Sequence, residues 1–150
     1  MNRGYCLKEE EYKKIQATLL FAKKLGLVEE ADLSALDKRR VDLNRKNQEK
    51  LTRGETVYGV ISYSPPAYLQ YELTRFKLDF IEEIYRIKER YSYREISEEE
   101  KRSFYSENMD LFTRYFGDAF SYEEVELIIE KRLREAEYDK NVKDILCKLP

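Results

Sequence analysis

The stretch that decides the fold is SPPAYLQYELTRFKLDFIEEIYRIKER, residues 64–90. Ser64 is a good N-cap, and the two prolines after it are tolerated in a first helical turn, where the backbone N–H has no partner. Apolar side chains then recur at helical spacing and cover most of the circumference. They are Tyr68, Leu69, Tyr71, Leu73, Phe76, Leu78, Phe80, Ile84, Tyr85 and Ile87. The pattern predicts a helix over residues 66–90 that is central to the fold or presents an extra face to a partner.

Four further helices are predicted around this one. Apolar periodicity indicates a helix over residues 8–25, which Gly26 can end in a left-handed conformation. A second helix should start near Asp32 or Ser34, which are both good N-caps, and run to about Thr52; its polar half, Asn44–Lys50, should project into solvent. Two Ser-x-x-Glu capping boxes open helices over residues 97–107 and 122–146.

Two segments between these helices lack helical periodicity. Residues 56–63, TVYGVISY, are β-branched and aromatic, and they are interrupted by Gly59. This composition predicts an extended arm or a short strand. Residues 108–119 are loop-like but carry apolar side chains that must pack on something. We therefore expect one all-α domain over residues 1–150, with about five helices and one extended arm at 56–63.

The composition excludes several classes of protein. Of the 150 residues, 42% are hydrophobic and 39% are charged, and 28 basic and 30 acidic residues leave a net charge of −2. The chain should fold, but it has no overall field that would attract nucleic acid or an anionic membrane. It contains no apolar run long enough to span a bilayer and no signal-peptide pattern at its start. Cys6 and Cys147, near opposite ends, are either unpaired or joined in a disulfide.

The absence of histidine limits the available chemistry. Ser–His and Cys–His nucleophilic pairs, histidine-containing zinc sites and phosphate-binding glycine loops are all missing, so no cofactor and no metal are expected. The acidic clusters stand at predicted helix starts, where negative charge complements the helix dipole. The basic residues between Lys38 and Arg53 alternate with acidic ones and indicate a solvated helix rather than a phosphate-binding surface.

The aromatic residues are the most unusual feature of the sequence. Thirteen Tyr and seven Phe are present, and many of them must form the core. Tyrosine combines a large apolar body with a polar tip, which suits adaptable contact with peptides. Tyr58, Tyr63, Tyr68 and Tyr71 lie in the arm or just after it, so these four are candidates for a binding surface as well as for the core.

Three stretches, residues 32–60, 63–84 and 96–140, resemble in this order the non-catalytic part of bacterial SurA/PrsA-type peptidyl-prolyl isomerases and foldases. The resemblance implies a long-helix chaperone scaffold that cradles unfolded polypeptide outside the cytoplasm. It implies a peptide-binding aromatic surface, for which the candidates are Tyr58, Tyr63, Tyr68, Tyr71 and Phe76. No parvulin domain fits between Phe112 and Tyr122, and the histidines of a parvulin site have no counterpart, so no catalytic residue is carried over.

Three functions remain open at this point. The leading hypothesis is a chaperone-like module that binds unfolded or extended polypeptides without a catalytic site, with a homodimer as one possible form. The second is a peptidyl-prolyl cis-trans isomerase. The third is an interaction protein for one dedicated partner.

Overall fold

The computed structural model describes residues 5, 7–114 and 116–150, and this described part is helical. The elements are α1 (Glu9–Lys24), α2 (Leu33–Thr52), α3 (Pro65–Ile81), α4 (Tyr85–Lys88), α5 (Glu98–Glu107), the 3-10 helix η1 (Met109–Phe112) and α6 (Tyr122–Lys148). Among the described residues the one β-type pairing is an isolated antiparallel bridge between Thr113 and Ala119. The predicted all-α class is confirmed. The arm at 56–63 runs as coil and bends and does not pair as a strand.

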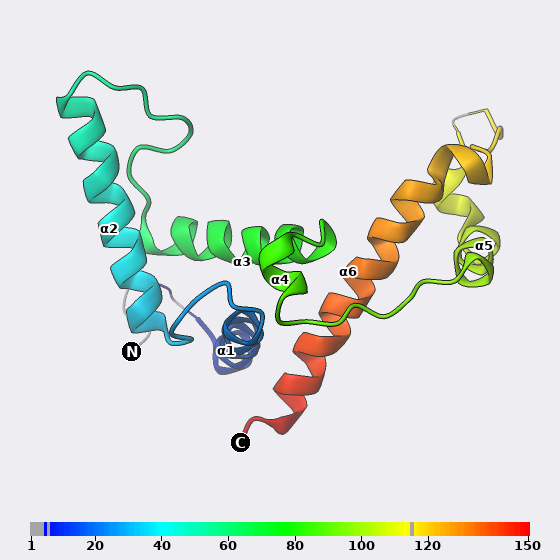
Figure 1. Ribbon diagram of the computed structural model, residues 1–150, viewed down its shortest axis with the longest axis horizontal. Helices are drawn as coiled ribbons and strands as arrows, with labels where there is room; N and C mark the ends of the chain where they lie inside the picture. Colours follow the sequence, from blue (N-terminus) through cyan, green and yellow to red (C-terminus); the bar gives the residue numbers. More distant parts are fainter. Residues whose placement is uncertain (1–4, 6, 115) are drawn as a thin grey trace.

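The helices form an open, two-armed arrangement rather than a bundle (Figure 1). Helix α3 spans the gap between two long helices, α2 and α6, which diverge from it. Helix α1 lies beneath α3, and α5 lies beside the N-terminal half of α6. The C-terminal end of α2 and the N-terminal end of α6 therefore rise on the same side of α3 (Figure 1).

The long helix predicted over residues 66–90 is broken in the structure. Helix α3 ends at Ile81, and Glu83 adopts φ 52°, a left-handed conformation that non-glycine residues rarely occupy. After this turn the short helix α4 leads into a connector that carries Tyr91 and Tyr93 back over the ring of Phe80, at centroid distances of 5.2 and 4.8 Å. The break follows from this tertiary packing, since the Glu-Glu-Ile sequence itself is compatible with a continuous helix.

The expected stop at Gly26 is confirmed. This glycine has φ 80°, and a Cβ at its position would lie 2.6 Å from Cδ of Arg90. Backbone conformation and close approach therefore both favour glycine here. The stop turns the chain sharply enough that only eight residues separate the end of α1 from the start of α2.

The hydrophobic core of the described residues consists of three separate clusters. One cluster joins α1, α2 and α3 through residues such as Leu19, Leu36 and Phe76. A second joins α1, α3 and α6, and its centre is a set of aromatic rings around Phe21 and Phe80. A third lies apart, where α5 and η1 pack on the N-terminal half of α6; its buried members are Phe112, Tyr122, Val125, Ile129 and Leu133. This division explains why both arms can project from the centre.

The second capping box, at the start of α6, is formed as expected. The Ser121 hydroxyl accepts a hydrogen bond from the Glu124 N–H, and the Glu124 carboxylate accepts one from the Ser121 N–H at 2.8 Å. Replacing Ser121 by Ala should lower the free energy of unfolding by about 1 kcal/mol, because a donor at the helix start loses its partner. Urea denaturation followed by circular dichroism would measure this. Ser103→Ala, in the exposed middle of α5, is the control and should be neutral or slightly stabilising; an equal loss in both variants would contradict the capping role.

Candidate functional site

The loop that follows α2 presents exposed apolar side chains at the tip of that arm. Tyr58 is 91% exposed, and Val60 and Ile61 are 49% and 44% exposed. Large apolar groups are usually scattered singly on the surface of a folded protein, whereas these three stand within four consecutive positions of one loop. We call Tyr58, Val60 and Ile61 the α2-tip surface.

Polar side chains of α2 hold this loop in place. Asn47 donates hydrogen bonds from Nδ2 to the carbonyl oxygens of Ile61 and Val60, at 3.0 and 3.3 Å. Asn44 exchanges two hydrogen bonds with the backbone of Tyr63, at 2.7 and 3.0 Å. The prediction that Asn44–Lys50 projects into solvent is therefore wrong for Asn47, which is only 7% exposed. Two asparagines three positions apart share a helix face, which was the one signal that could have revealed the contact.

Replacing Asn47 by Ala should release the loop while leaving the helices in place. Two backbone carbonyl oxygens would lose their donor, at a cost of about 1–3 kcal/mol for the local structure. Limited proteolysis at Tyr58 should then become faster, with little change in helix content by circular dichroism. Gln48→Ala, the exposed neighbour, is the control; equal cleavage rates in the two variants would show that Asn47 does not hold the loop.

A second group of exposed apolar side chains stands at the tip of the other arm. Leu111 is 55% exposed, Phe120 is 39% exposed, and Leu127 and Ile128, in the first two turns of α6, are 64% and 51% exposed. We call these four residues the α6-tip surface. Their positions follow from the small third core cluster, which buries the opposite face of the same segments.

The five predicted site residues do not form one surface. Tyr68 and Phe76 are 6% and 5% exposed and belong to the core cluster of α1, α2 and α3. Tyr63 is half-buried, and Tyr71 is 42% exposed. Their rings form a group with the ring of Tyr68, in which each pair of centroids is 5.3–5.9 Å apart. Tyr58 is the most exposed of the five. The structure thus assigns Tyr68 and Phe76 to the core, and the binding role of all five stays a prediction.

Sequence reasoning missed Val60, Ile61 and the whole α6-tip surface. Apolar residues of the core and of the surface recur with the same spacing along the sequence, so the spacing does not distinguish them.

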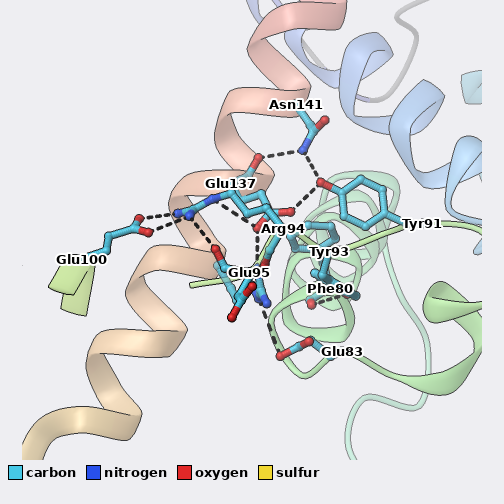
Figure 2. A network of polar contacts seen from close by, with 10 residues as sticks. Phe80, Glu83, Tyr91, Tyr93, Arg94, Glu95, Glu100, Glu137 and Asn141 are labelled. Atoms are coloured by element: carbon cyan, nitrogen blue, oxygen red, sulfur yellow. Dashed lines mark hydrogen bonds and ion pairs between the residues drawn. The ribbon is translucent and has the colours of Figure 1, made fainter. Parts of the chain in front are cut away.

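A polar network joins the connector after α4 to the middle of α6 (Figure 2). Arg134 donates to the carboxylate of Glu137 at 2.7 Å and to the carbonyl oxygen of Arg94 at 2.6 Å. Tyr91 donates its hydroxyl to Glu137 at 2.6 Å, and Asn141 donates to the Tyr91 hydroxyl at 3.0 Å. Burial raises the pKa of Tyr91 to about 12, with a further contribution from its hydrogen bond to Glu137. Nε of Arg134 has no hydrogen-bond partner in the described part of the protein and lies 3.6 Å from the Glu83 carboxylate. The other contacts of the network join its members to one another, which indicates a structural role.

The described carboxyl groups whose pKa is shifted are all shifted downward. The pKa of Asp37 is lowered, chiefly by its hydrogen bond from Arg40, and that of Glu100 chiefly by its hydrogen bond from Arg94. Glu55 and Glu98 also have lowered pKa values. A carboxyl group that acts as a general acid near neutral pH needs a raised pKa, so these four groups are suited to ion pairing rather than to proton donation.

Three further expectations concern metal ligands, a membrane span and the two cysteines. Within residues 5, 7–114 and 116–150, no three potential ligands of the His, Cys, Asp or Glu type come together to hold a metal ion. None of the described helices is long and apolar enough to cross a bilayer. Cys147 is exposed, and its possible pairing with Cys6 involves a residue outside the described part.

The chain resembles part of a glycoside hydrolase. Crystal structures of a GH136 lacto-N-biosidase from Eubacterium ramulus, in its native and selenomethionine forms, match 92% of this chain at 28% sequence identity, with TM-scores of 0.75 and 0.73. The matched part is 28% of the lacto-N-biosidase chain, so this chain spans little more than a quarter of its length. No protein-family model and no curated protein matches the sequence.

This finding corrects the functional expectation from sequence. The resemblance to SurA/PrsA-type foldases is wrong, because the matching structure is a glycoside hydrolase. The chaperone scaffold, the binding of unfolded polypeptide, the isomerase alternative and the dedicated-partner alternative fall with it. The expected location outside the cytoplasm loses its basis as well. The misleading stretches consist of helix caps and charged amphipathic helices, which any helical protein can contain.

Proposed function

We propose that this chain is the helical domain of a glycoside hydrolase of the lacto-N-biosidase kind, acting on glycans that contain lacto-N-biose. In this proposal the chain supports hydrolysis by packing against the catalytic part of the enzyme. The observation that carries it is the likeness to the Eubacterium ramulus lacto-N-biosidase over 92% of this chain at 28% identity. A shared fold alone would be a weak argument for function, but here the likeness extends to sequence.

The open, two-armed shape of this chain supports a role in packing against the catalytic part of the enzyme. Nearly three quarters of the lacto-N-biosidase chain lies outside the matched part. The loop after α2 and the N-terminal part of α6, which carry residues of the α2-tip and α6-tip surfaces, belong to two arms that rise on the same side of α3 (Figure 1). Apolar groups at these positions would be covered if a folded catalytic domain lay between or against the arms.

The charges of the chain support a non-catalytic contribution. Most glycoside hydrolases use two carboxyl groups, one of which is a general acid with a raised pKa. The described carboxyl groups with shifted pKa values have lowered values instead. Each of them interacts with a cationic side chain or a tyrosine hydroxyl. In this proposal the catalytic carboxyl groups belong to the other part of the enzyme.

A chimeric enzyme tests the proposal. The matched segment of the Eubacterium ramulus lacto-N-biosidase is replaced by this chain, and release of nitrophenol from p-nitrophenyl lacto-N-bioside is measured. We expect kcat/KM within about tenfold of the parent enzyme, and a loss of soluble activity when the segment is simply deleted. A chimera no more active than the deletion variant would overturn the proposal.

Charged substitutions in the chimera test the packing surfaces. Tyr58→Glu with Ile61→Glu and Leu127→Glu places carboxylates on both tips and should abolish or strongly reduce activity, because an apolar interface does not tolerate unpaired charges. Tyr85→Glu, at a 77% exposed aromatic position on α4, is the control and should retain activity. Full activity in the tip variant would exclude these tips as the interface.

A further inference from the structure

A groove lies between α1, α3 and α6, and none of its lining residues belongs to either tip surface. Its volume is about 800 Å³, within the range of small-molecule sites. The groove has an apolar floor and a polar rim. Its lining residues are Lys14, Thr18, Gln70, Leu73, Thr74, Lys77, Leu78, Tyr138, Asp139, Val142, Lys143 and Leu146.

The floor combines apolar contact area with one unsatisfied polar group. Leu78 is 51% exposed although it belongs to the most apolar helix of the chain. Tyr138 is 3% exposed, and its hydroxyl has no hydrogen-bond partner in the described part of the protein. A buried hydroxyl without a partner is unusual in a native protein, and a bound water or ligand is one way to satisfy it.

Lysine side chains dominate the charge of the rim. Lys14, Lys77 and Lys143 line the groove together with a single carboxylate, Asp139. Lys77 pairs with Asp139 at 3.0 Å and with Glu135 at 3.6 Å. Lys14 and Lys143 are exposed, and neither ammonium group has an ion pair within residues 5, 7–114 and 116–150. The rim thus retains positive charge that a ligand could neutralise.

The remaining polar groups suit hydroxyl-rich ligands. Gln70 and Thr74 are exposed neighbours on α3, 3.4 Å apart between the Gln70 amide nitrogen and the Thr74 hydroxyl. Amide and hydroxyl groups can each donate and accept, as sugar hydroxyl groups do. The exposed Leu78 side chain offers an apolar contact for the C–H face of a pyranose ring.

We propose that the groove between α1, α3 and α6 binds an anionic oligosaccharide, one that carries a carboxylate or sulfate group. The choice of a sugar as the ligand rests on the proposed function, whereas the negative charge rests on the lysines of the rim. Lys14 and Lys143 contact the acidic group, Gln70 and Thr74 bind sugar hydroxyls, and Leu78 packs against the ring.

Isothermal titration of the 150-residue chain with 3′-sialyllactose, lactose 3′-sulfate and lactose tests this site. We expect saturable binding of the two anionic sugars, at least about fivefold tighter than that of lactose, and weakening as NaCl is raised. Lys14→Glu with Lys143→Glu should remove this preference. Lys46→Glu with Lys88→Glu, on α2 and α4, gives the same change in net charge and should leave binding unchanged.

Three outcomes would overturn the site: no saturation with either anionic sugar, equal affinity for lactose, or equal behaviour of the two double variants. Circular dichroism of each variant shows whether the helices remain folded. Direct binding does not depend on hydrolysis, so this test fails or succeeds separately from the chimera assay. Binding by a chain that restores no activity in the chimera would overturn the proposed function and leave the groove as a sugar site.

Discussion

Replacing Phe80 by Ala should lower the free energy of unfolding by about 3–5 kcal/mol, the largest effect we expect from a single apolar substitution. Phe80 is fully buried, and its ring lies 4.8–5.7 Å from the rings of Phe21, Tyr91, Tyr93 and Tyr138. These rings belong to α1, α3, the connector after α4, and α6. The substitution would therefore leave a cavity where four separate segments meet.

Urea denaturation followed by circular dichroism and by tyrosine fluorescence measures this effect. Tyr85→Ala removes an aromatic ring that is 77% exposed and should change stability by less than about 0.5 kcal/mol. A loss below about 1 kcal/mol for Phe80→Ala would mean that the aromatic cluster is not the centre of the fold. If the tyrosine fluorescence changed at a urea concentration where the circular dichroism still showed full helix content, unfolding would not be a single transition. The two arms would then unfold separately.

Replacing Arg134 by Met should also destabilise the protein by about 3–5 kcal/mol, because it leaves the carboxylate of Glu137 buried without its nearest cation. The two side chains are 11% and 6% exposed, and their atoms lie 2.7 Å apart. Arg134 also donates to the carbonyl oxygen of Arg94 and stacks over the ring of Tyr93 at 4.9 Å. The same substitution therefore loosens the connector from α6 (Figure 2).

A double-mutant cycle separates the ion pair from the packing. Arg134→Met with Glu137→Gln should be less destabilised than the sum of the single variants, by about 1–3 kcal/mol, because the uncompensated charge is then removed. Arg132→Met, at a largely exposed site on the same helix, is the control and should have little effect. Additive losses in the double variant would mean that the two charges do not interact in solution.

The resemblance to a glycoside hydrolase changes how the apolar surface is interpreted. The sequence predicts a binding surface for extended polypeptide from the apolar third helix and the aromatic arm. In the structure much of that aromatic content is core, as Tyr68 and Phe76 show. Groups such as Ile61 and Leu127 remain exposed, and the proposed function accounts for them as contacts with the catalytic part of the enzyme.

Local information determined the helices and most of their ends. The capping box at Ser121 and the left-handed Gly26 were recognisable because their hydrogen bonds and backbone conformation involve neighbouring residues only. The all-α class followed from the same local pattern. Tertiary structure alone decided the break at Glu83, the buried role of Asn47 and the assignment of tyrosines to core or surface. Each of these depends on contacts between segments far apart in the chain, such as Tyr93 with Phe80 or Asn47 with Ile61, and helical periodicity carries no information about which distant segment will cover a given face.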